Sequence, residues 1–130
     1  MKIITEAGDL KGKRVLVRVD WNVPMRSSVV LDDFRIKASM PTLELLAKAG
    51  AEVIIGTHLV DGNITSLTPF VPNGMKLLEN LRDNPGEKEN SEEFAQELAA
   101  QADIYVNEAF PESHRPFASI VGVPKLLESF

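Results

Sequence analysis

Short apolar segments with β-branched residues recur along the chain and predict the strands of a sheet. RVLVRV (14–19), AEVIIGT (51–57) and DIYVNEA (103–109) alternate or run apolar, and MKLLEN (75–80) is a shorter and weaker candidate. Polar or turn-forming residues follow each segment, so each predicted strand has a defined end.

Residues 31–50, between the first two strands, have the spacing of a helix. Asp32 or Asp33 is a plausible N-cap, and Gly50 is placed to end the helix. Pro41 falls in the middle, where its missing N–H predicts a kink or two consecutive helical pieces. The apolar stripe expected to face the sheet consists of Phe34, Ile36, Leu43, Leu46 and Ala47.

A second helix is predicted over residues 90–102, before the last strand. Ser91 can cap it, and the two glutamates that follow suit the positive end of the helix dipole. Phe94, Leu98 and Ala102 fall on one face, which we expect to be buried.

The alternation of strands and helices predicts parallel strands joined by right-handed crossovers. The expected fold is α/β: a Rossmann-like parallel sheet, reduced in size, with helices on both faces in a three-layer αβα arrangement. Residues 1–130 are expected to form a single domain, because one core is feasible at this length. Residues 58–74 are rich in Gly, Pro, Asn, Ser and Thr and are expected to be a loop.

Composition and charge exclude several classes of function. The net charge of −5 argues against a nucleic-acid partner, which needs a basic face. The absence of cysteine excludes disulfides and thiol catalysis, and we expect no metal site. No segment approaches the roughly 20 apolar residues of a membrane helix, so no membrane partner is expected. The first residues lack the apolar run of a signal peptide, and the cytoplasm is the expected compartment.

Residues suited to chemistry follow the ends of the predicted strands. In an open parallel sheet, ligands bind beyond the carboxyl ends of the strands. Arginine binds carboxylates and phosphates through a planar fork that lysine lacks. We therefore predict a site for a small, hydroxylated polyanion. The candidate residues are Arg18, Asp20, Asn22, Arg35, His58, Glu79, Asn80, Arg82, Asn107, Glu108, His114 and Arg115.

Plainer explanations apply to these residues taken singly. Asp20 and Asn22 are also turn formers before a proline, and His58 could cap a strand end. Glu79 and Glu108 could pair with neighbouring arginines. Their joint occurrence at successive strand ends favours the functional interpretation. Neither G-x-G-x-x-G nor a Walker sequence is present, so nothing here is expected to hold a nucleotide.

Four segments resemble the N-terminal lobe of phosphoglycerate kinase: DLKGKRVLVRVDWNVP, DDFRIKASMPTLELL, LLENLR, and ADIYVNEAF followed by SHRPFASIVGVP. The resemblance implies a two-lobed glycolytic kinase, a phosphotransferase. Its N-terminal lobe holds 3-phosphoglycerate or 1,3-bisphosphoglycerate, and its C-terminal lobe holds Mg-ATP or Mg-ADP. Closure of the hinge then permits phosphoryl transfer. Because the nucleotide lobe is absent here, no cofactor is expected on this chain, and the chain alone is expected to be inactive.

The resemblance also implies roles for the candidates around the first strand. Asp20 and Asn22 would contact the hydroxyl and carboxylate region of the glycerate. Arg35 would be the catalytic residue that neutralises the phosphoryl group in flight. Trp21 stands where the family usually has phenylalanine, and it would point away from the ligand into the packing.

The other candidates would bind the non-transferred 3-phosphate. The resemblance implies this role for His58, Arg82 and Arg115, with Arg18 and His114 completing a basic patch.

Four departures from the family affect this interpretation. The chain stops near Phe130, before the nucleotide lobe, and HLVDG replaces the family's HLGRP, so Asp61 stands in place of an arginine. A carboxylate about 4–6 Å from a phosphate opposes binding by about a few kcal/mol. The segment before LLENLR is shortened by about one strand and one helix, and the uncovered sheet edge favours self-association. Phe117 also replaces a histidine of the family's motif.

Two alternatives stay open. The chain could be a non-catalytic anion-binding or regulatory module, as the charge reversal at Asp61 suggests. It could also be half of a split kinase whose nucleotide lobe is a separate polypeptide.

Overall fold

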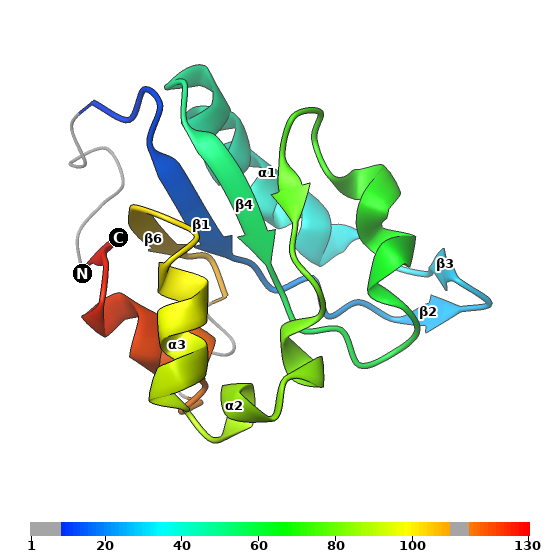
Figure 1. The fold of residues 1–130 in the computed structure, drawn as a ribbon. Helices are drawn as coiled ribbons and strands as arrows, with labels where there is room; N and C mark the ends of the chain where they lie inside the picture. The colour runs from blue at the N-terminus through cyan, green and yellow to red at the C-terminus, as the bar shows by residue number, and fades with distance from the viewer. Residues whose placement is uncertain (1–8, 110–114) are drawn as a thin grey trace.

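The computed structural model in Figure 1 describes residues 9–109 and 115–130, and its centre is a parallel sheet. The sheet has five strands in the order β5-β4-β1-β6-β7. Its members are β1 (Arg14–Arg18), β4 (Glu52–Gly56), β5 (Lys76–Leu77), β6 (Ile104–Asn107) and β7 (Glu128–Ser129). The α/β prediction is confirmed, and β7 is the strand of this sheet that the sequence pattern did not predict.

Helical segments cover both faces of the sheet (Figure 1). Val15 and Val17 of β1 face a core shared with α1 (Phe34–Lys48) and the 3₁₀-helix η2 (Ile64–Phe70). Leu16 faces the opposite core, which contains residues of α3 (Glu92–Ala99). The remaining short helices are η3 (Leu81–Asp83), α2 (Pro85–Lys88), the π-helix η5 (Ala118–Gly122) and η6 (Val123–Lys125). The burial on both faces confirms the three-layer arrangement.

Helix α1 differs from its prediction in two respects. Residues 34–48 form one α-helix with Pro41 inside it, so the alternative of two pieces is wrong. Phe34 is 74% exposed and Ala47 is also exposed, so neither belongs to the buried stripe. Ser39 is part of the buried stripe, because its hydroxyl accepts a hydrogen bond from the buried indole of Trp21. The buried residues of α1 are Ile36, Ser39, Leu43 and Leu46.

The predicted ends of the two helices are mostly confirmed. Asp32 Oδ1 accepts a hydrogen bond from the N–H of Phe34, while the side chain of the N-cap residue Asp33 makes no capping bond. Gly50 follows α1 with φ +83°, a conformation that glycine adopts at low cost. Ser91 Oγ caps α3 by accepting from the N–H of Phe94.

The structure contains a hairpin that the sequence did not predict and a short helix within a predicted loop. The strands β2 (Met25–Arg26) and β3 (Val29–Val30) form a small antiparallel hairpin. Its turn places Ser27 and Ser28 at φ 50° and 65°, as a two-residue hairpin requires. Within the predicted loop 58–74, η2 begins after Asn63, whose side chain accepts from the N–H of Thr65.

Candidate functional site

Asp20 and Asn22 follow the carboxyl end of β1, and the side chain of Arg35 at the start of α1 reaches both residues. Arg35 Nη1 donates to the carbonyl oxygen of Asn22 over 2.8 Å and approaches Asp20 Oδ1 at 3.4 Å. Asp20 is buried, whereas the Arg35 side chain is 51% exposed. Its Nη1 atom is thus held by protein while half of the guanidinium side chain faces outward.

Trp21 holds the chain in place just after β1. Its indole is completely buried, and Nε1 donates to Ser39 Oγ over 2.9 Å. Its backbone N–H donates to Thr57 Oγ1 at the end of β4. The inward position predicted for Trp21 is confirmed, and its neighbours Asp20 and Asn22 lie on the other side of the chain by alternation.

Two asparagines fix the loop that leaves β4. Asn22 Oδ1 accepts from the N–H of Val60 over 2.9 Å. Asn80 Oδ1 accepts from the N–H of Leu59, and its Nδ2 donates to the Leu59 carbonyl over 2.7 Å. These hydrogen bonds therefore hold the backbone of Leu59 and Val60. Asp61, the next residue, is exposed.

His58 lies at the end of β4 in a buried polar network. Its Nε2 atom is 2.5 Å from Glu87 Oε2. Glu87 also accepts from Ser119, through the backbone N–H at 2.7 Å and the hydroxyl at 2.5 Å. Arg18 Nε donates to the same hydroxyl over 2.9 Å. Arg18, Glu87 and Ser119 are each at most 1% exposed, so the network lies inside the protein.

This network corrects the prediction for Arg18 and adds Glu87 to the residues near the strand ends. Arg18 is buried at the end of β1 and does not extend an exposed basic patch. Glu87 was missed, because it sits in the polar segment PGEKEN, which has the pattern of an exposed turn. Tyr105 is buried beside these charges, and its hydroxyl has no hydrogen-bond partner among the described residues. Burial raises the pKa of this phenol above its usual range.

Phe117 brings His58 and Arg115 together. The Phe117 ring stacks on the His58 ring at a centroid distance of 4.7 Å, and Arg115 Cζ lies 6.0 Å from the same phenyl centroid. Arg115 is exposed, as is Arg82 in η3. His114 lies outside the described residues. The side chains of His58 and Arg115 thus both lie against the ring of Phe117. Phe117 is the residue that replaces the family's histidine.

The remaining candidate residues make other contacts. Glu108 Oε1 accepts from the hydroxyl of Thr42 over 2.5 Å, rather than pairing with an arginine. Asn107 Oδ1 accepts from the N–H of Ala109 and so stabilises the turn after β6. Glu79 is exposed and lines the cavity described next.

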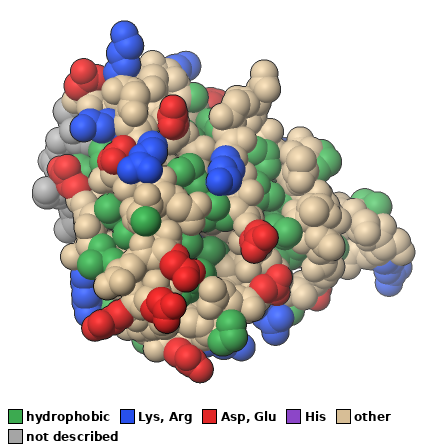
Figure 2. All heavy atoms as spheres, in the orientation of Figure 1, with side chains coloured by type: hydrophobic (Ala, Val, Ile, Leu, Met, Phe, Trp, Pro, Cys, Tyr) green, Lys and Arg blue, Asp and Glu red, His purple; other side chains and the backbone are tan. Residues whose placement is uncertain are grey.

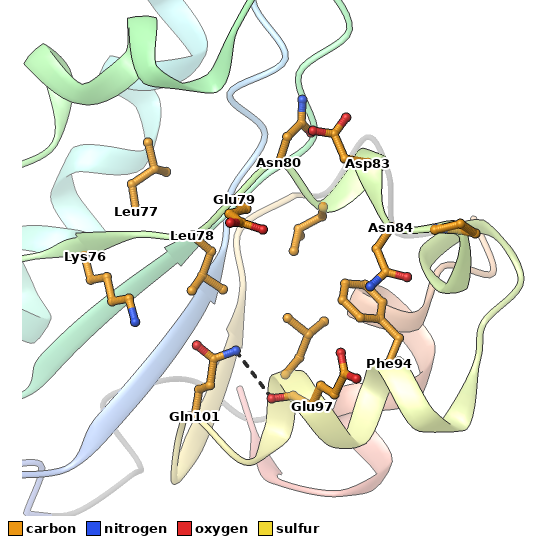
Figure 3. Close-up of a pocket in the computed structure, with 13 residues that line it drawn as sticks. Lys76, Leu77, Leu78, Glu79, Asn80, Asp83, Asn84, Phe94, Glu97 and Gln101 are labelled. Atoms are coloured by element: carbon orange, nitrogen blue, oxygen red, sulfur yellow. Dashed lines mark hydrogen bonds between the residues drawn. The ribbon is translucent and has the colours of Figure 1, made fainter.

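A cavity of about 570 Å³ lies between β5 and α3, as Figure 3 shows. Leu78 and Phe94 contribute apolar surface, while Glu79, Asp83 and Glu97 contribute carboxylates. Figure 2 shows further acidic side chains over the region of α2 and α3. This cavity is acidic and does not suit an anion, so the basic side chains at the strand ends remain the candidate anion site.

The described residues, 9–109 and 115–130, contain neither a metal-binding cluster nor a membrane-spanning helix. Within these residues, no group of three or more His, Cys, Asp or Glu side chains has an arrangement that could hold a metal ion. No helix in the described part of the chain is long and apolar enough to cross a membrane.

Comparisons with known proteins identify the chain's relatives. A family model described as phosphoglycerate kinase matches residues 4–73 and 60–130. A phosphoglycerate kinase of Picosynechococcus is 44% identical over 156 residues, covering 92% of this chain and 39% of the relative. One from Leptospira biflexa is 37% identical over 162 residues, covering 98% and 41%. The chain therefore spans about 40% of the length of these curated relatives.

Solved structures agree with this assignment. The phosphoglycerate kinase of Coxiella burnetii superposes with a TM-score of 0.81 at 30% identity, covering 93% of this chain and 39% of that structure. The Pyrococcus horikoshii enzyme gives a TM-score of 0.79 at 26% identity, covering 96% and 41%. The two family-model matches overlap at residues 60–73, where the sequence indicated a shortened segment. The chain belongs to the phosphoglycerate kinase family and corresponds to the N-terminal lobe of its members.

Proposed function

We propose that this chain is a phosphoglycerate-binding lobe that takes part in cytoplasmic phosphoryl transfer together with a nucleotide-binding lobe. The observation that carries the proposal is the position of Arg35. Its Nη1 atom is held by the Asn22 carbonyl and lies near Asp20, while the side chain stays half exposed at the sheet's carboxyl edge. A guanidinium held in this way is oriented before ligand arrives and keeps other N–H groups for an anion.

The 3-phosphate is proposed to bind on the opposite side of the β4 exit. Arg115 and His58 both contact Phe117 there, and Arg82 is exposed in the helix that follows β5. Asp20 and Asn22 would then face the hydroxyl and carboxylate of the glycerate. This arrangement places a cationic side chain at each end of a short molecule that carries two anionic groups.

Phosphoryl transfer depends on positioning and on offsetting the charge of the transferred group. In this proposal, Arg35 supplies the offsetting charge and Asp20 holds Arg35 in place. The nucleotide lobe would supply Mg-ATP or Mg-ADP, so the chain alone binds its ligand but does not transfer phosphate.

Calorimetric titration with 3-phosphoglycerate tests the proposal, with glycerate as the ligand that lacks phosphate. Arg35→Ala and Arg115→Ala are each expected to weaken binding about tenfold or more, since a charged hydrogen bond contributes about 1.5–3 kcal/mol. Arg26→Ala is the matched control, because Arg26 is exposed on the β2 hairpin. Equal affinity for glycerate, or equal weakening by Arg26→Ala, would contradict a specific phosphate site.

The charge at Asp61 favours one alternative, a non-catalytic module that has lost or changed its ligand. The exposed carboxylate follows a loop that Asn22 and Asn80 hold in place. If the wild-type chain binds no phosphoglycerate but Asp61→Arg does, the site has been altered at this residue. The split-kinase alternative predicts a different result. In that case the wild type and Asp61→Arg both bind phosphoglycerate, and ATP forms from 1,3-bisphosphoglycerate and Mg-ADP only after a relative's nucleotide lobe is added.

A further inference from the structure

Glu87 is a buried carboxylate that the proposed binding site does not yet use. It is 0% exposed, and its two oxygens receive hydrogen bonds from three groups: the Ser119 N–H, the Ser119 hydroxyl and His58 Nε2. Burying a charge is costly unless partners compensate it, and apolar residues often replace such groups without loss of stability. Packing alone therefore does not explain a carboxylate at this position.

The contacts of Glu87 determine which nitrogen of His58 can face a ligand. An ionised carboxylate only accepts hydrogen bonds, so the proton between the two groups belongs to His58 Nε2. Nδ1 is then the ring nitrogen left to meet an anion, and it donates a hydrogen bond to that anion only when the ring carries a proton on both nitrogens, with Glu87 as the counter-ion. Phe117 stacks on the ring at 4.7 Å and restricts its rotation.

Glu87 also ties the segment that carries Arg115 to the strand ends. Ser119 follows Phe117 by two residues, and both its N–H and its hydroxyl bind Glu87. The same hydroxyl accepts from Arg18 at the end of β1. The carboxylate thus joins α2, the end of β4 and the start of η5.

We propose that Glu87 is a positioning residue for the 3-phosphate end of the site. It holds His58 with Nε2 inward and Nδ1 toward the ligand, and through Ser119 it holds the segment that presents Arg115. This inference rests on the proposed function, because it takes the phosphate of phosphoglycerate to be the ligand of His58 and Arg115.

Glu87→Gln tests the proposal with little change in size. The Ser119 N–H requires the amide oxygen, so the amide NH₂ of the glutamine would face His58 Nε2 and turn it into an acceptor. Without the carboxylate as its counter-ion, the His58 ring would keep a single proton, on Nδ1, and would no longer present a positive charge to the phosphate. We expect the ¹⁵N spectrum of the His58 ring to show Nε2–H in the wild type and its loss in the variant. We also expect the affinity for 3-phosphoglycerate to fall at least tenfold.

Glu89→Gln is the matched control, because Glu89 ends the same helix but is exposed. It should change neither the ring spectrum nor the affinity. Should Glu87→Gln fail to fold, the wild type still decides: 3-phosphoglycerate must perturb Nδ1 of His58 more strongly than Nε2. The reverse order of perturbation overturns the proposal.

The outcomes separate this inference from the proposed function. Wild-type binding together with unchanged affinity in folded Glu87→Gln overturns the role of Glu87 and leaves the binding site intact. Absence of binding in the wild type overturns the proposed function and this inference with it.

Discussion

Replacing Trp21 by phenylalanine removes the group that anchors the end of β1. The indole is fully buried, and Nε1 donates to Ser39 Oγ over 2.9 Å. The smaller ring leaves a cavity, which costs about 1–2 kcal/mol on the scale of large-to-small core substitutions. The lost hydrogen bond adds about 0.5–1 kcal/mol, at the low end because Ser39 still donates to the Ile36 carbonyl. We expect a total loss of about 1.5–3 kcal/mol.

Urea unfolding followed by circular dichroism measures this loss, since Trp21 is the only tryptophan and its fluorescence disappears in the variant. Ser39→Ala and the double variant complete a cycle. A coupling energy of about 1 kcal/mol between the two side chains is expected. A loss below about 0.5 kcal/mol, or the absence of coupling, would refute the anchoring role of the indole.

Three further changes test local features of the structure. The Arg14 hydrogen bond lowers the pKa of Asp103 to about 2, so Asp103 stabilises the fold above the usual carboxyl pKa. The stability difference between wild type and Asp103→Asn should therefore shrink as the pH falls from about 4 to about 2 in acid-unfolding curves. Tyr105→Phe removes a buried hydroxyl without a partner among the described residues and should raise the free energy of unfolding by about 1 kcal/mol in urea titrations. Gly86→Ala would place a methyl 2.8 Å from Phe94 Cβ and should lower the melting temperature, with a cost of about 1–3 kcal/mol.

The layers of the fold were predictable because local and tertiary preferences agree in the strands. In RVLVRV and AEVIIGT, apolar residues, most of them β-branched, face both sides of a buried sheet, and the observed strands lie within these segments. The stripe of α1 was less predictable. Phe34 is apolar yet 74% exposed, whereas polar Ser39 is buried because the indole of Trp21 needs its hydroxyl. A partner 18 positions away cannot be inferred from helical spacing.

The candidate site shows the same limit. The positions after the first strand led to the prediction of Asp20 and Asn22, since parallel strands bring their carboxyl ends to one edge. Arg35, predicted at the start of the first helix, lies beside both residues. Glu87 could not be found in this way, because the residues that bury it come from distant segments. Arg18 was predicted to be part of a basic patch, but it is buried and donates a hydrogen bond to the hydroxyl of Ser119.

A titration of the ¹⁵N-labelled chain with 3-phosphoglycerate, followed by amide chemical shifts, tests the proposed phosphoglycerate site most directly. We predict saturable shifts at Asp20, His58, Arg82 and Arg115, and their loss in both Arg35→Ala and Arg115→Ala. Absence of shifts at millimolar ligand, or shifts confined to the acidic cavity between β5 and α3, would contradict it.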